Sequence, residues 1–230
     1  MFNSNMYNAS WKIEVDEFDG YEELELGFNL CRNTTLWESY LEDEYFEYDK
    51  YYTNYTIEIL TNFDEEQIKI GEVNITDFDL FSINSDDVDL FDLFDSIDDE
   101  YMKVGDALVN CEVLKSIINF DTNLLYLEKI IINKSFRNHG IGLRIIKKLE
   151  EIIPNLLNYR PDILLLCSYP IEYQAENKET MLKNNKVEEY NLEFKKLSDK
   201  LNSFYIKCGL KEIEYDDDTF YYSIWNKFNY

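Results

Sequence analysis

The sequence has few of the residues that break or cross-link a polypeptide chain. It contains seven glycines, three prolines and four cysteines among 230 residues. So little glycine and proline argues against a protein dominated by low-complexity segments or linkers. The cysteines stand far apart, without a CxxC pair or a histidine at ligand spacing. We therefore expect reduced thiols, with no disulfide, no zinc site and no other metal.

Long apolar runs are also missing. No run approaches the ~20 apolar residues that a helix needs to cross a bilayer. The first residues, MFNSNMYNASWK, lack the basic start and the apolar centre of a secretory leader. We therefore expect a cytoplasmic protein that makes no membrane contact. A hydrophobic fraction of 45%, rich in phenylalanine and tyrosine, provides for a real core.

Basic residues are scarce in the first part of the chain. Residues 1–100 carry 28 acidic and four basic side chains, a net charge of −24, whereas residues 101–230 carry 19 and 18, a net charge of −1. The acidic residues 1–100 would repel a polyanion, so we expect no direct nucleic-acid binding. They would attract a cationic amine or a basic protein. Acidity that only confers solubility explains the composition equally well.

Alternation of apolar and polar residues predicts four strands in the first half. Trp11–Phe18 and Glu22–Leu30 flank a turn at Asp19-Gly20, and Tyr52–Leu60 and Gln67–Ile75 form a second hairpin. Residues 121–230 continue with a buried strand that starts at Leu124.

Helical spacing predicts three helices before that strand. They cover residues 35–50, Ile97–Leu108 with Ser96 or Asp95 as the cap, and Val113–Phe120.

After the Leu124 strand, a helix with an apolar stripe runs from Ile141 to Ile153 and ends at Pro154. Asp162–Tyr169 is a short apolar run typical of a central strand. A polar stretch then leads into a helix that ends at Gly209. The hairpin Lys211–Tyr215 and Phe220–Trp225 follows. This order predicts α/β layering.

The loop Arg137-x-x-Gly140-x-Gly142 joins the Leu124 strand to its helix. Glycine lets the backbone approach a phosphate, and a helix N-terminus favours an anion. The G-x-G-x-x-G fingerprint and the G-K-S/T of a Walker loop are both absent. The acetyl-CoA loop pattern, Q/R-x-x-G-x-G/A, remains.

A second segment, Phe204-Tyr-Ile-Lys-Cys-Gly209-Leu210, is similar to an F-Y-x-K-x-G-F element. Together, in this order and spacing, the two segments resemble the GNAT superfamily of N-acetyltransferases over residues 121–230. The sequence departs from the family at Asn138, where glycine is common, and at Leu210, where phenylalanine is usual. A helical segment also falls between the second hairpin and the motif strand, unlike in the family.

The resemblance implies one GNAT-like α/β domain over residues 1–230, with a central mixed twisted sheet flanked by helices. Residues 121–230 would be the acetyl-CoA-binding half. Residues 1–120 would be an enlarged, acidic, strand-rich half on the acceptor side. Acetyl-CoA would be the co-substrate, and a primary amine of a cationic small molecule or a basic protein would attack it directly in a ternary complex.

The resemblance also assigns roles to residues. The backbone of Ile130 and Ile132 would pair with the pantetheine arm, and Arg137 would orient the loop or reach a phosphate. The pyrophosphate would be held by the amides of Asn138, His139, Gly140, Ile141, Gly142 and Leu143.

Tyr205 matches the general acid, because a phenol with a pKa near ~10 is close enough to a thiol at ~8.5 to protonate the departing thiolate. The alternative is a core tyrosine. Glu128 lies where some members place a base, but a solvated glutamate at the edge of the strand explains it too. Glu72 or Asp77 could serve instead.

A rival function keeps the fold without turnover. Such a protein would bind acyl-CoA, or its acidic surface would occupy a basic partner as a decoy.

Overall fold

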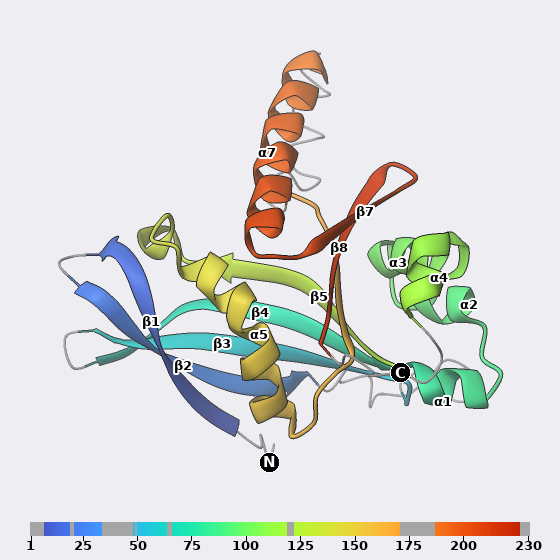
Figure 1. Ribbon diagram of the computed structural model, residues 1–230, viewed down its shortest axis with the longest axis horizontal. Helices are drawn as coiled ribbons and strands as arrows, with labels where there is room; N and C mark the ends of the chain where they lie inside the picture. The colour runs from blue at the N-terminus through green and yellow to red at the C-terminus, as the bar shows by residue number, and fades with distance from the viewer. Residues whose placement is uncertain are drawn as a thin grey trace, which may run out of the picture.

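The computed structural model describes residues 7–18, 21–33, 48, 50–63, 66–118, 122–170 and 187–225. Eight strands form one mixed sheet in the order β1-β2-β3-β4-β5-β6-β8-β7, with helices on both faces (Figure 1). The expected mixed α/β architecture is therefore confirmed. None of the helices described is both long and apolar enough to cross a membrane.

The first four strands form an antiparallel meander that continues into the fifth. They are β1 (Tyr7–Phe18), β2 (Tyr21–Asn33), β3 (Tyr52–Phe63), β4 (Glu66–Asp79) and β5 (Asn123–Ile132). Both hairpins expected from the alternation are confirmed, because β1 pairs with β2 and β3 pairs with β4 in antiparallel register.

The last three strands complete the sheet after a parallel step from β5. They are β6 (Ile163–Cys167), β7 (Lys211–Tyr215) and β8 (Asp218–Ile224), and β8 lies between the other two. The expected central strand and final hairpin are confirmed.

Four short helices fill the connection between β4 and β5, where the sequence predicts two. They are α1 (Leu80–Ser85), α2 (Leu90–Asp95), α3 (Asp99–Asn110) and α4 (Glu112–Ile117). A 3-10 turn at Lys134–Phe136 precedes α5 (Ile141–Leu157), and α7 (Val187–Lys207) precedes β7. Figure 1 shows the four short helices gathered at one side of the molecule and α5 lying across the sheet.

The two faces of the sheet carry separate cores. The stripe of α5 packs on Leu125 and Leu127 of β5, together with inward residues of β2, β3 and β4. Leu124 and Tyr126 point to the opposite face, where the four short helices cover them. This strand is therefore buried on both sides at its start.

Two of the expected helix boundaries are wrong, and a third is confirmed. The cap of α3 is Asp98, whose side chain accepts from the amides of Glu100 and Tyr101, whereas Ser96 ends α2. Pro154 lies inside α5 rather than after it. Gly209 follows α7 with a φ of +90°, as its expected role as a C-terminal cap requires.

The helix expected over residues 35–50 and the loop expected after residue 170 fall almost wholly outside the described residues.

The strands β5 and β6 are the parallel pair of this sheet, and they diverge after a short paired stretch. The register covers Leu124–Tyr126 of β5 against Ile163–Leu165 of β6, and β5 then continues to Ile132 without its neighbour. A β-bulge opposes Asn74 to Lys129 and Ile75 to Leu127, which leaves Glu128 as the extra residue. We call this divergence of β5 and β6 the seam.

Candidate cofactor-binding and catalytic site

The free edge of β5 faces the seam. Asn133 donates its amide to the carbonyl of Ile70 on β4, with an N···O distance of 2.8 Å. Backbone groups of alternate residues point to the same side in an antiparallel ladder. The N–H and C=O groups of Ile130 and Ile132 therefore point away from β4. Within the described residues, no strand pairs with this edge beyond Tyr126.

Arg137 ties the loop to the end of this strand. Its Nε donates to the carbonyl of Ile132 at 2.7 Å. Of the two roles expected for Arg137, this contact fits the orientation of the loop. It also occupies the carbonyl of Ile132, which leaves the Ile130 backbone and the Ile132 amide as the groups able to pair with a ligand.

The loop adopts the left-handed conformation twice. Asn138 has a φ of +68° and Gly140 a φ of +74°. Asparagine tolerates this region better than most side chains do, so the departure from glycine at this position keeps the required backbone geometry. Gly140 is the N-cap of α5, with no side-chain cap bond and no acidic residue in the first turn.

The first-turn amides of α5 therefore have neither a capping side chain nor an acidic residue within their own turn. Helix N-termini in this condition favour anions, because the first N–H groups have no partner inside the helix.

The end of α7 lies over the start of α5. A Cβ built on Gly142 would lie 3.6 Å from Cζ of Phe204, which places this ring against the glycine. Beside it is an open cavity of about 350 Å³, lined by Asp199, Lys200, Ser203, Phe204 and Lys207. The two sequence motifs, 62 residues apart between Gly142 and Phe204, thus meet in space.

Tyr205 is buried beneath this contact, with 8% of its surface exposed. Its ring centroid lies 5.2 Å from that of Tyr221 on β8 and 5.4 Å from that of Phe204. Burial raises the pKa of Tyr205 well above its usual value, and the thiols of Cys208 and Cys167 add to this shift. The phenol therefore stays protonated at neutral pH. It lies close enough to Cys167, at the end of β6, for the two groups to interact electrostatically.

Glu128 lies in the middle of β5 and is half-buried. Its Oε1 lies 2.5 Å from both the Thr76 Oγ1 and the Tyr101 hydroxyl, which are 2.6 Å from each other. Thr76 Oγ1 is also 2.7 Å from Asn54 Oδ1. Burial and the charge of Glu128 raise the pKa of Tyr101. Tyr101 therefore holds its proton as a donor to the carboxylate.

Sequence reasoning missed this cluster. Thr76 and Tyr101 are separated from Glu128 by 52 and 27 residues. No motif joins them, so only the pairing of β4 with β5 and the docking of α3 bring them together.

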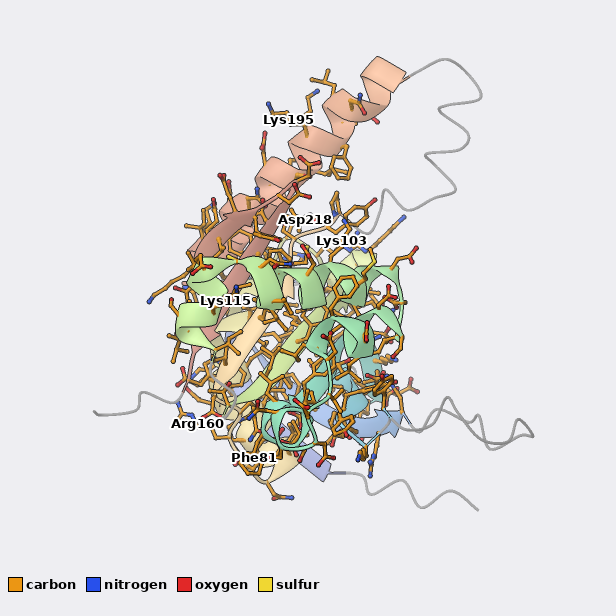
Figure 2. The ribbon with its side chains drawn as sticks, turned by 90° about the vertical axis from the view of Figure 1, so that its right-hand side faces the viewer. Phe81, Lys103, Lys115, Arg160, Lys195 and Asp218 are labelled. Atoms are coloured by element: carbon orange, nitrogen blue, oxygen red, sulfur yellow. The ribbon has the colours of Figure 1, made fainter. Side chains whose placement is uncertain are left out.

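Helix α3 crosses the seam on this face. Tyr101 reaches Glu128 on β5, while Lys103 lies 3.1 Å from the Asp218 carboxylate at the start of β8. Figure 2 shows Lys103 and Asp218 close together beside this helix. Tyr126 of β5 donates to Glu100 Oε1 at 3.0 Å, and burial of the Glu100 carboxyl raises its pKa.

The other expected candidates lie elsewhere. Glu72 pairs with Lys69 at 3.0 Å. Asp77 receives a hydrogen bond from Tyr159, at the opposite end of β5 from the loop. His139 is half-buried within the loop itself. Glu128 is therefore the candidate base that lies beside the free edge of β5.

No family model matches this chain, and no curated protein matches it.

Proposed function

We propose that the protein is a GNAT-type N-acetyltransferase that moves an acetyl group from acetyl-CoA to a primary amine. One observation carries the proposal: the β5–β6 seam opens towards the Arg137–Leu143 loop, with Tyr205 on one side and Glu128 on the other. This arrangement supplies a backbone edge, an anion site, an acid and a base around one opening.

The residues around this opening fit acetyl-CoA, the proposed donor of the acetyl group. An extended pantetheine arm would pair with the Ile130 backbone and the Ile132 amide as an added strand does. The amides of residues 138–143 at the start of α5 would receive the pyrophosphate. The cavity beside Phe204 offers Lys200 and Lys207 to a further phosphate.

The chemistry then requires three proton transfers. The acceptor ammonium loses a proton, which we assign to Glu128 directly or through water. The neutral amine attacks the thioester carbonyl, and a backbone amide of the β5 edge stabilises the oxyanion. The carbon–sulfur bond breaks as Tyr205 protonates the departing thiolate. The amide nitrogen then releases its extra proton, which passes through water and restores the Tyr205 hydroxyl.

The acceptor side is assigned to the α3 face and the acidic residues 1–120. Glu100 and Glu128 both lie on this face, and the Glu128 charge contributes to the raised pKa of Glu100. Two neighbouring carboxylates favour a cationic acceptor: a small polyamine-like molecule, a protein lysine or a protein N-terminus.

A second candidate is a protein that keeps this fold and binds acyl-CoA or a basic partner without turnover. The observation in its favour is the burial of Tyr205, which packs as a core residue.

A thiol-release assay separates the two functions. We expect acetyl-CoA to release free thiol with one member of a panel of amines and basic proteins. Tyr205→Phe should reduce kcat by about 10²–10⁴-fold, the usual contribution of a general acid, while acetyl-CoA binding is retained. Tyr222→Phe is the matched control, because Tyr222 is equally buried, at 9%, on the other face of the sheet.

Unchanged turnover in Tyr205→Phe would remove Tyr205 from the mechanism. Binding of acetyl-CoA without thiol release against any acceptor would favour the non-catalytic protein.

A further inference from the structure

A second cavity, of about 340 Å³, lies at the end of the sheet away from the loop. It is lined by Lys50, Tyr51, Tyr52, Thr53, Asp77, Asp79, Asn123 and Tyr159. These residues come from the starts of β3 and β5, the end of β4 and the segment after α5. Asn123 and Ile132 are the two ends of β5, so about 30 Å separates this cavity from the loop.

Asp77 is a half-buried carboxylate of this lining. Its carboxylate accepts a hydrogen bond from the hydroxyl of Tyr159. Burial raises the pKa of Asp77 to about 6. The hydrogen bond from Tyr159 opposes this shift, and the neighbouring charge of Asp79 adds to it. No basic side chain within the described ranges forms an ion pair with Asp77 or Asp79.

Lys50 does not neutralise this pair, because it is engaged at the rim. Its Nζ lies 2.8 Å from Asp86 Oδ2, and the Tyr51 hydroxyl donates to the same oxygen at 2.9 Å. Lys50 and Asp86 cancel each other. Asp79 caps α1, where its carboxylate accepts from the Ser82 amide at 3.0 Å and from the Ser82 hydroxyl at 2.6 Å. Asp77 is therefore the carboxylate of this lining that has neither a cationic partner nor a capping role.

The aromatic lining suits a cation as well. Tyr51, Tyr52 and Tyr159 contribute phenol rings to the cavity, and the face of such a ring attracts an ammonium group. The Nζ of Lys50 already lies 4.6 Å from the centroid of the Tyr51 ring. The Tyr51 ring is therefore already engaged by the ammonium group of Lys50, and this contact illustrates the one that a bound cation would make with another ring of the lining.

We propose that this cavity binds a small organic ammonium ion. The ammonium group donates to Asp77, close to Asp79, and the carbon chain lies against the tyrosine rings. The volume is near the lower end of those of small-molecule sites, which fits a short alkyl amine. In the described part of the chain, no group of three or more acidic, histidine or cysteine side chains could hold a metal, so two carboxylates with aromatic rings favour the organic cation.

The site lies apart from the seam at which the acetyl transfer is proposed. It shares no residue with the seam, and Asp77 points to the α5 side of the sheet, where Tyr159 lies, while Glu128 points to the α3 side. The titratable and charged groups that face it from every neighbouring element are Lys50, Tyr51, Tyr52, Tyr55, Asp79, Asp86 and Tyr159.

Calorimetric titration of the whole protein with butane-1,4-diamine tests the proposal. We expect saturable binding, and we expect Asp77→Asn to weaken it by at least about tenfold, the scale of one lost charged hydrogen bond. Affinity should fall as the pH drops through about 6, because protonation removes the charge of Asp77. Butan-1-ol, which has no charge, should not bind.

Glu151→Gln is the matched control, since it alters an exposed carboxylate of α5 that pairs with Lys148 at 2.7 Å, and binding of the diamine should be unchanged. Circular dichroism of each variant checks that it folds. Absence of saturable binding in the wild type would overturn the proposal. Binding that is lost in Glu128→Gln and kept in Asp77→Asn would place the amine at the seam and would also overturn it. Displacement of the diamine by stoichiometric Mg²⁺ would identify a metal site instead.

Discussion

At the scale of single residues, Asn138 shows why a sequence pattern can be kept while its commonest residue is replaced. The position needs a φ of +68°, which asparagine adopts with little cost. The chemistry of the loop depends on its amides and not on this side chain, so the substitution preserves what the pattern specifies.

Replacement of Asn138 should therefore depend on backbone conformation. Asn138→Ala should lower the free energy of unfolding by about 1–2 kcal/mol, because a Cβ without a polar group is strained in this region. Asn138→Gly should be close to neutral. Urea denaturation measures both, and equal stabilities of the two variants would contradict the assignment.

Asp77 makes a prediction about pH. Its pKa is about 6 when folded, above its usual 3.8, so the folded state holds the proton more strongly than the unfolded state does. Its contribution to stability is therefore fully present below pH ~4 and is lost as pH rises through about 6, by roughly 3 kcal/mol in total.

Asp77→Asn removes this titration. The stability of the variant relative to the wild type should rise between pH ~4 and ~6 and become constant above. Denaturation at a series of pH values measures the difference, and a difference that does not change with pH would contradict the raised pKa.

At the scale of elements, the packing of α2 against α3 depends on Gly105. A Cβ built there would lie 2.7 Å from Cβ of Phe94, and neither backbone can move without moving its helix. This close approach seals the core beneath the four short helices, which in turn hold Tyr101 against Glu128.

Gly105→Ala should destabilise the protein by about 1–3 kcal/mol, because overpacking outweighs the ~1 kcal/mol gain in helix propensity. Gly142→Ala is the control in another helix, where the added Cβ would meet Phe204 at an ordinary 3.6 Å. Thermal unfolding should show loss for the first variant and little change for the second. Equal changes in thermal stability for the two variants would show that helix propensity, and not overpacking at Phe94, sets the effect of Gly105→Ala.

The sequence predicts the strands and long helices better than the short helices. Alternation is clear in Tyr52–Leu60 and Gln67–Ile75, and a stripe of five apolar residues marks α5. In contrast, α1 and α2 have six residues each, too few for a helical period to emerge. Their start signals, Asp79 and Asp89, lie among so many acidic residues that none stands out.

The candidate site divides in the same way. The loop and the Phe204–Leu210 segment are local motifs, so they can be recognised without coordinates. The cluster of Thr76, Tyr101 and Glu128 depends on strand register and on a bulge, and the cavity at Asp77 joins four separate elements. Neither follows from spacing along the chain.

At the scale of the whole molecule, the charge is divided between the two halves of the chain. The excess of −24 in residues 1–100 would draw a cationic acceptor from a distance. The Debye length falls from about 30 Å at 0.01 M salt to about 3 Å at 1 M, so such attraction is sensitive to ionic strength.

If the acidic half steers the acceptor, kcat/KM for a cationic amine should fall steeply as salt rises. An acceptor that is neutral at the assay pH provides the control and should respond weakly. A flat response for the cationic amine would leave solubility as the role of the acidic half.

The seam has a consequence for how the molecule fluctuates. Three registered pairs join β5 to β6, against twelve between β3 and β4. Local opening should therefore start there, and the amides of β6 and β8 should exchange with solvent sooner than those of β3 and β4. A molecule bound along the Ile130 edge would become part of the ladder, so slower exchange in strands that it never touches would report that the seam is filled.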